Sequence, residues 1–441
     1  MASTEPYFGP EVVDRDTGGE FVRELKAATA FVVGTAPIHE VHATAEDRAP
    51  YINKKIIIRK RSEIATHFGP ARDGYTLPQT LDAMFDQAED RGIGTICVVN
   101  VFDPDVHKDG GSLPDPSLVT NLDIVGDFDA AGVPSGMKLA YSCFQSFGWF
   151  PKILLTPGFS GLTGVRAEGI VIANRIRARF LHDAPLGVTT QQTIEARGAG
   201  GDFDWQSNST RHLLLWPHMM ALNTDTTSAN AGKSVAESYS ARFAGVMLRT
   251  VVELGYHHSP SNRPIYGIED AAQDVLYIPG DLQSDVQLLR GAGIITSEER
   301  WGKGPHTSGN RSAAYPTVTD MRNFIHVQYI EDVMDEAVLF FLDEWKDRNA
   351  NPASIEHMED KVNAWLGTKM SGSDPVLYDG RFSFDRQKTT PETVADGHLF
   401  WNLEYAPVGI MERLTVERYI NIDLIRNALG LSTSTAPNVP A

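Results

Sequence analysis

The chain has 441 residues, too many for one ordinary hydrophobic core, so two or more domains are expected. Hydrophobic residues make up 42% and charged residues 22%, which is typical of soluble globular proteins and excludes disordered and collagen-like classes. The formal net charge is −18 and no basic run exceeds Arg59–Lys60–Arg61, so a nucleic-acid partner, which would need a stripe of Lys and Arg, is not expected.

The first 26 residues contain no apolar face of helical length, and Tyr7 to Val13 reads as a short extended segment. They also lack the basic and apolar regions of a signal peptide, so synthesis in a cytoplasm is expected. No run of about 18 apolar residues occurs, so direct membrane insertion is not expected.

From residue 30 onward, strands and helices alternate. Strands are predicted at 30–36, 55–59 and 93–102, with a helix at 77–88 before the last of them. The β-branched run at 55–59 is typical of a strand buried on both faces. Strand, helix and strand in this order predict a parallel pair with a right-handed crossover.

Residues 103–136 are rich in Asp, Gly and Pro and predict a loop. Strands at 152–156 and 213–216 alternate with helices at 165–181 and 235–254. The loop-rich stretch 256–316 indicates a domain junction.

Two helices are predicted over 321–345 and 355–366, the second beginning at the Pro352 and Ser354 start signal. Strands follow between 397 and 424, and a low-complexity tail begins after Gly430. No internal repeat is visible.

Cys97 and Cys143 are the two cysteines, which excludes a disulfide framework and a cysteine-rich metal site. Both lie among apolar neighbours and are expected to be buried, inert thiols. An intersubunit disulfide is the alternative.

Two segments approach catalytic motifs and then depart from them. Residues 158–162 resemble the G-x-S-x-G nucleophile elbow around Ser160, but Leu162 occupies the last position, where the sharp turn needs glycine. Gly232–Lys233–Ser234 resembles the end of a phosphate-binding loop, but Thr227 stands where the first glycine belongs. A turn and a helix start capped by Ser234 explain them equally well.

Metal-ligand spacing is also incomplete. His257–His258 is not H-E-x-x-H, and adjacent histidines on a helix or strand point in different directions. Asp123, Asp127 and Asp129 lack the closing glutamate of a calcium loop. We therefore expect no catalytic, cofactor-binding or metal-ligating residues. The alternative is an α/β hydrolase-like enzyme with Ser160 as nucleophile.

A set of short landmarks, in order, resembles the major tail sheath proteins of contractile phage tails and R-type bacteriocins. The landmarks extend from about Tyr7 to Arg426, and each is weakly specific by itself. They include Tyr7–Val13, Phe31–Ala36, Val98–Val101, Leu214–Pro217, Gly255–Asn262, Gly309–Arg311, Phe324–Val327 and Asp396–His398. Residues 103–136 and 198–210 match nothing in that pattern and are interpreted as outward-facing insertions.

The resemblance implies an α/β (α+β), multidomain fold in which an outer α/β domain is inserted into an inner strand-and-helix assembly domain. The implied parts are an N-terminal arm (1–26), the outer domain (27–255), the inner, tube-facing domain (256–425) and a C-terminal arm (426–441).

The resemblance also implies a structural subunit and no enzyme. Such subunits polymerise as hexameric rings into a helix around the tail tube and contract to drive the tube through a target envelope. The implied partners are other copies of the chain, the tail tube protein, and the baseplate and tail terminator proteins, without a cofactor. The implied location is the virion tail, assembled in the host bacterial cytoplasm, and a sheath from a non-phage injection system would share the mechanism.

The resemblance assigns the site residues to two surfaces. Neighbouring subunits are expected to exchange their terminal arms as added strands. The arm residues are Tyr7, Phe8, Val12, Val13, Leu424 and Ile425. Tube contact is placed on the helix 355–370, at Lys361 and Lys369.

Overall fold

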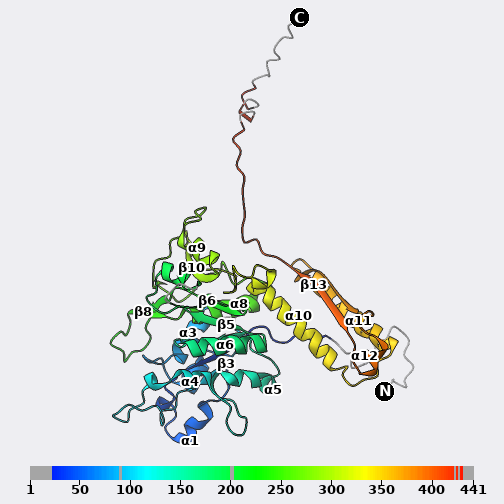
Figure 1. Cartoon of the computed structure of the whole chain (residues 1–441). Helices are drawn as coiled ribbons and strands as arrows, with labels where there is room; N and C mark the ends of the chain where they lie inside the picture. The colour runs from blue at the N-terminus through cyan, green and yellow to red at the C-terminus, as the bar shows by residue number, and fades with distance from the viewer. Residues whose placement is uncertain (1–21, 89–91, 199–202, 422–423, 426–427, 431–441) are drawn as a thin grey trace, which may run out of the picture. The chain divides into compact units, whose positions relative to one another are not determined.

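The structure is a computed structural model that describes residues 22–88, 92–198, 203–421, 424–425 and 428–430 (Figure 1). It divides into one unit that ends at Val408 and a second that begins at Gly409. The expected mixed α/β, multidomain class is confirmed. Among the described residues, no helix combines the length and apolar character needed to cross a bilayer.

An eight-stranded sheet is the centre of the first unit, in the order β11-β10-β6-β5-β4-β1-β3-β2. β1, β3, β4, β5, β6 and β10 are parallel, while β2 and β11 add antiparallel at the two edges. The strand bounds are β1 Thr29–Gly34, β2 Ile56–Ile58, β3 Thr95–Asn100, β4 Ile153–Leu155, β5 Arg179–Asp183, β6 His212–Leu215, β10 Ile294–Arg300 and β11 Gly304–Ser308.

Helices cover both faces of this sheet. Along β1, Ala30 and Val32 face one core and Phe31 and Val33 face the other, as expected for a strand buried on both sides. The first core is closed by α3 (Leu77–Asp86) and α8 (Tyr239–Glu253), and the second by α4 (Asn121–Val125) and α6 (Thr163–Ile176). The remaining short helices are α1 Ala45–Arg48, α2 Ser62–Phe68, α5 Cys143–Phe147, α7 Thr190–Glu195 and α9 Asp285–Gly291.

A second, smaller core lies between α10 (Ile325–Asp343), α11 (Pro352–Met370) and the antiparallel pair β12 (Leu377–Phe384) and β13 (Trp401–Pro407). We call this part, residues 325–408, the small domain; it also contains α12 (Pro391–Ala395). α11 begins where the sequence predicted, because Asn351 and Ser354 form a reciprocal capping box around Pro352.

α10 belongs to both cores. Ile325 and Tyr329, in its first turns, pack into the core under the large sheet. Val338 and Phe341, farther along, pack into the core of the small domain. The large and small cores therefore share one continuous helix, drawn in yellow in Figure 1.

Several expected elements differ in the structure. The run at 55–59 forms β2, which pairs antiparallel with β3 at the sheet edge, so the predicted parallel pair of these two strands is wrong. The parallel crossover instead joins β1 to β3. The helix expected at 165–181 ends at Ile176, where Arg177 adopts a left-handed conformation, and β5 follows. Residues 234–237 form β8 and do not begin the following helix.

The stretch 256–316, predicted as a junction, contributes β10 and β11 to the large sheet. The sheet therefore continues to Ser308, past the boundary expected at residue 255. A separate small sheet joins β7 (Met219–Leu222) with β8 (Ser234–Glu237) and β9 (Asp270–Ala271) in the order β8-β7-β9.

The loop region 103–136 contains a repeat that the sequence did not reveal. Asp109 accepts hydrogen bonds from the main-chain N–H groups of Gly111 and Leu113, at 2.9 and 2.8 Å. Twenty residues later, Asp129 accepts at 2.8 Å from both Ala131 and Val133. The two turns share an aspartate that organises a five-residue loop, although their other residues differ.

Candidate assembly surfaces

Within the part of the chain that the structure describes, the β12–β13 pair has one covered edge and one open edge. Asn363 of α11 bonds both main-chain groups of Phe382, each at 2.8 Å, and Glu359 accepts from the N–H of Phe384 at 2.7 Å. Because these groups point away from β13, side chains of α11 occupy the outer edge of β12. In the register of the pair, Phe382 lies opposite Leu403.

The outer edge of β13 is different. An antiparallel ladder alternates between bonded and non-bonded pairs, so Trp401, Leu403 and Tyr405 turn their main-chain groups away from β12. Among the described residues, β13 pairs with no strand other than β12. An open edge of this kind is a template for another strand.

The second unit, from Gly409, supplies an unpaired extended segment. Residues 409–421 have no regular secondary structure. Leu414, Val416 and Ile420 are 77%, 89% and 85% exposed, and their spacing places them on one face of an extended chain. Apolar side chains at this spacing are typical of a strand with one buried face, and the described residues of this unit do not bury them.

The expected arm residues are only partly visible. Tyr7, Phe8, Val12 and Val13 lie outside the described residues. Leu424 and Ile425, expected to be extended, lie in a helical turn with exposed side chains. Their predicted part in subunit contacts stays a prediction.

The two expected tube-contact lysines lie on α11, where both are half-buried. The ammonium group of Lys369 forms an ion pair with Glu24 and lies 5.9 Å from the centre of the Trp365 ring. Because Lys369 has these partners within the chain, its availability to a tube is lower than the sequence suggested. Contact with a tube stays a prediction for both lysines.

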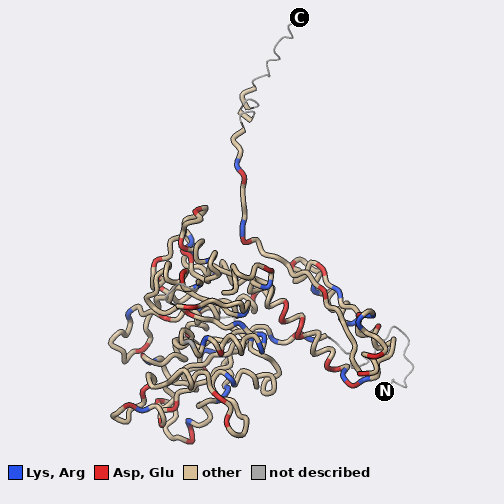
Figure 2. Tube along the Cα trace, viewed as in Figure 1, with Lys and Arg blue, Asp and Glu red and all other residues tan. Residues whose placement is uncertain are grey.

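Buried ion pairs join α10 to the first residues of the central strands. Acidic positions recur along this helix (Figure 2). Arg179 of β5 donates to Asp332 at 2.6 Å, and Arg211, before β6, donates to the same carboxylate at 3.0 and 2.5 Å. Lys152, before β4, pairs with Glu336. Burial alone would raise the pKa of Asp332, but Arg179 and Arg211 together hold it below its ordinary value.

We call this set of buried charges on α10 and the central strands the joint, and the ring of Tyr329 also belongs to it. The Arg179 guanidinium lies 3.7 Å from the centre of the Tyr329 ring, close enough for a cation–π contact. Burial raises the pKa of the Tyr329 hydroxyl to about 12. These contacts therefore keep the Asp332 carboxylate charged and the Tyr329 hydroxyl neutral across the physiological range.

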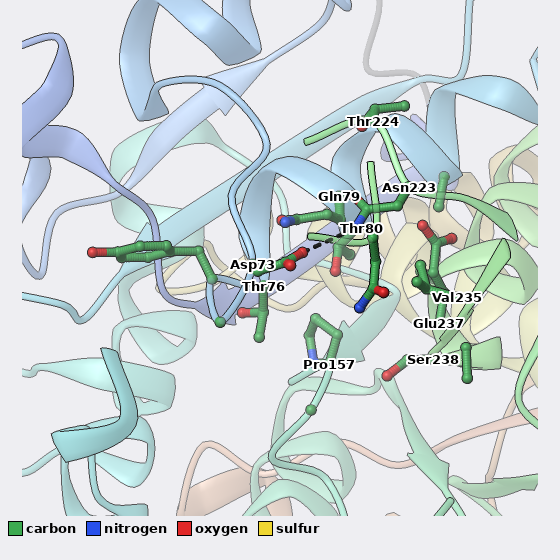
Figure 3. Close-up of a pocket in the computed structure, with 17 residues that line it drawn as sticks. Asp73, Thr76, Gln79, Thr80, Pro157, Asn223, Thr224, Val235, Glu237 and Ser238 are labelled. Atoms are coloured by element: carbon green, nitrogen blue, oxygen red, sulfur yellow. Dashed lines mark hydrogen bonds between the residues drawn. The ribbon is translucent and has the colours of Figure 1, made fainter. Parts of the chain in front are cut away.

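A pocket of about 320 Å³ opens at the carboxyl ends of β1 and β4 (Figure 3). In open α/β sheets this edge is a common ligand site, because the strand order reverses there. Here the loops bond to one another: Asn223 donates to Asp73 at 3.1 Å, and Asp225 accepts from the N–H of Asp73 at 2.9 Å. Neither histidine nor cysteine is among the described residues that line the pocket.

Ser160 does not have the environment of a nucleophile. Its side chain is 2% exposed, and its hydroxyl accepts a hydrogen bond from the N–H of Asp183 at 3.1 Å. The Asp183 carboxylate is engaged with the N–H of Ser240 at 2.7 Å. The serine thus closes a turn against β5 inside the protein. Lys233, of the incomplete phosphate loop, donates to the carbonyl of Ala229 at 3.1 Å.

His257 and His258 do not diverge, in contrast to the expectation for a helix or strand. They lie in a turn after α8, and the Nε2 atoms of both face Oδ2 of Asp374, at 3.2 and 2.8 Å. Asp374 lies 116 residues away from His258, in the turn between α11 and β12. No local motif could have indicated this cluster.

No family model matches the chain. The tail sheath protein of Burkholderia phage BcepMu is 29% identical to it, covering 96% of this chain and 98% of that protein. The tail sheath protein of Escherichia phage P2 is 24% identical, covering 96% and 97%. The predicted resemblance to tail sheath proteins is confirmed over nearly the whole chain.

Solved structures give the same fold. The contracted sheath complex of the PVC extracellular contractile injection system covers 96% of this chain and 99% of its own, with a TM-score of 0.62 and 14% identity. The contracted helical sheath of the anti-feeding prophage covers 96% of this chain and 100% of its own, with a TM-score of 0.63 and 14% identity. The relatives are structural proteins and not enzymes, and the hydrolase alternative has no support.

Proposed function

We propose that this chain, a homologue of the tail sheath proteins of contractile phages, is the subunit that polymerises helically around a tail tube and contracts. The full-length similarity to sheath proteins, on both chains, is the observation that carries this function. Contraction of the assembled sheath would drive the tube through the envelope of a target cell.

Strand exchange at β13 is the proposed link between subunits. No described strand pairs with the outer edge of β13, and the segment after Gly409 has the exposed, alternating apolar pattern of a strand that lacks a partner. If a neighbouring copy donated this segment as a strand, main-chain hydrogen bonds would pair both the outer edge of β13 and the segment itself. Head-to-tail contacts of this type generate an open helix when the rotation between copies does not close. We assign the N-terminal arm, with Tyr7, Phe8, Val12 and Val13, and Leu424 and Ile425 to these links.

The two cores suggest that the large and small domains occupy different positions in the sheath. We place the large α/β domain on the outside of the sheath, with the insertions near 103–136 and 198–210 facing outward. We place the small domain on the inside, where Lys361 and Lys369 of α11 face the tube. The joint at α10 supports moving this boundary from residue 256 to the start of that helix, since β10 and β11 belong to the large sheet.

The wider assembly follows from the same function. We propose hexameric rings of this chain, a tail tube protein inside them, a baseplate at one end and a terminator protein at the other. The sheath would form in the host cytoplasm and remain in the virion tail. The extended state would be metastable, so that contraction releases free energy stored at assembly without nucleotide hydrolysis.

Electron microscopy of the purified full-length chain tests the function. Negatively stained samples at rising protein concentration are expected to contain helical tubes with a central lumen. A variant that ends at Val408 is the matched control, since it retains the first unit and lacks the second. Folded protein that stays monomeric at every concentration, with and without a tube to assemble on, would overturn the proposal.

A further inference from the structure

We infer that His257, His258 and Asp374 form a binding site for a divalent transition metal ion, with Zn²⁺ as the best fit. Each residue offers one ligand atom, and these atoms lie within 4.8 Å of one another. Two imidazole nitrogens and one carboxylate oxygen are a ligand set that suits zinc. The inference is independent of the proposed function.

The spacing of the ligand atoms is close to that of a coordination sphere. Zinc–nitrogen and zinc–oxygen bonds of about 2.0–2.1 Å in a tetrahedron place neighbouring ligand atoms roughly 3.3 Å apart. The two Nε2 atoms lie 3.2 and 2.8 Å from Oδ2 of Asp374. Two of the three separations between ligand atoms are therefore within about half an ångström of the tetrahedral value, and the third is at most 4.8 Å.

The backbone explains why two adjacent histidines converge. They follow α8 in a turn, where successive side chains need not alternate as they do in a strand. Gly255, with φ of +108°, leaves room for the first ring: a Cβ atom there would lie 2.9 Å from Nδ1 and Cε1 of His257. The two imidazole centroids are 4.4 Å apart.

The polar environment also favours a cation. Nε2 of His257 is buried and makes no well-aligned hydrogen bond to any described residue, although Oδ2 of Asp374 lies 3.2 Å away. A buried nitrogen of this kind is costly unless something satisfies it. Asp374 is exposed, so an ion can enter from solvent and keep water as its remaining ligand. The neighbouring cation, Lys369, is paired with Glu24.

A bound ion would join distant parts of the chain. His257 and His258 follow α8, which packs under the large sheet, and Asp374 follows α11 of the small domain. The ion would thus connect these two cores at a second place, in addition to α10. Its role would be structural, because it would link the turn after α8 to the turn after α11.

Isothermal titration of the untagged full-length chain, after chelation and desalting, tests the site with ZnCl₂ as the probe. We expect one Zn²⁺ per chain. His258→Ala and Asp374→Asn should each weaken binding by at least about tenfold, since loss of a supporting contact alone has that effect. His398→Ala and Asp360→Asn, two exposed positions of the same residue types, are the matched controls and should bind as the unmodified chain does.

Circular dichroism must show that all four variants fold, and both test positions are partly exposed, so folding should survive. Zinc should also raise the melting temperature of the unmodified chain and of the controls but not of the two ligand variants. Absence of zinc binding to the unmodified chain, or equal binding to Asp374→Asn, would overturn the inference. So would an equal response to Mg²⁺, which does not favour imidazole ligands.

Discussion

Arg179, at the start of β5, donates to the carboxylate of Asp332 on α10 at 2.6 Å, and both side chains are fully buried. Removing one member of such a pair leaves the other charge buried without compensation. We expect Asp332→Asn to lower the free energy of unfolding by about 3–5 kcal/mol. Urea unfolding measures it.

The exposed pair of Asp320 and Arg322 provides the control for that measurement. Asp320→Asn should cost no more than about 1 kcal/mol, because surface ion pairs contribute little. Equal losses at Asp320 and Asp332 would show that the joint does not depend on the buried pair.

Stability should fall in mild acid because of two buried histidines. Burial lowers the pKa of His182 to about 3 and lowers that of His212 as well, and the two rings are in contact at 3.1 Å. Below about pH 6.5 the unfolded chain takes up protons at these sites and the folded chain does not. The free energy of unfolding should therefore drop as the pH falls, by about 1.4 kcal/mol per pH unit for each histidine.

Urea unfolding between pH 6.5 and pH 5 measures this slope. His182→Gln should reduce the part that the two histidines contribute by about half, and the same substitution at exposed His398 serves as the control. A slope that His182→Gln leaves unchanged would contradict the assignment.

The two thiols should be unreactive in the folded protein. Cys97 and Cys143 are both free and fully buried, and burial, together with the neighbouring Cys143, raises the pKa of the Cys97 thiol. Because the thiolate is the reactive form, we expect no reaction with a disulfide reagent until urea is added, and then two thiols per chain. A dimer on a non-reducing gel of assembled protein would instead indicate an intersubunit disulfide.

The C-terminal segment should be needed for assembly and not for folding. Val416→Asp places a charge on the apolar face of the proposed strand, while Thr415→Asp places the same charge on the opposite face. Burial of an unpaired carboxylate at a subunit contact should raise the concentration needed for tubes by at least about tenfold. Negative staining and sedimentation give the result, and the melting temperature should not change in either variant. Equal assembly of both variants would argue against strand exchange here.

Charge reversal on α11 should weaken tube binding. The double variant with Lys361→Glu and Lys369→Glu is expected to bind a preformed tube at least about tenfold less in a co-sedimentation assay, because the two lysines are proposed to meet an acidic tube surface. Lys388→Glu, an exposed lysine of the same domain, is the control. Glu24→Gln removes the ion pair with Lys369 and leaves both lysines in place, so it shows how much of the loss in tube binding comes from that ion pair alone. Unchanged binding of the double variant would rule out this surface.

The sequence predicted the elements whose apolar pattern is strong and local. Four strands (β1, β3, β4 and β6) lie within a few residues of their expected positions, because burial on both faces of the sheet requires continuous apolar runs. The helix α3 was predicted from the apolar residues that recur on one of its faces. The sequence did not predict β10, β11 and β12, in which Ser297, Glu298, Pro305, Asp379 and Gly380 interrupt continuous apolar runs. These strands form because neighbouring strands pair with them, and the pairing is not visible in a local window.

The candidate surfaces also differ in whether they depend on a local pattern or on distant contacts. Leu414, Val416 and Tyr419 led to the prediction of a strand after β13, but the structure has an extended segment without a strand at 409–421. The open edge of β13 could not be predicted, because it depends on Asn363 and Glu359 of α11 covering the other strand. The cluster of His257, His258 and Asp374 depends on a turn and on a distant contact, and neither leaves a trace in residue spacing.

α10 has a mechanical consequence. A helix of 19 residues is roughly 28 Å long, and its ends are fixed in two different cores. Because packed residues hold both ends of this helix, a rotation of the small domain would be passed to the large domain through a stiff element. In a helical sheath of such subunits, rotation of each subunit as a rigid body can change the radius of the sheath. Contraction then needs no unfolding of the individual chain.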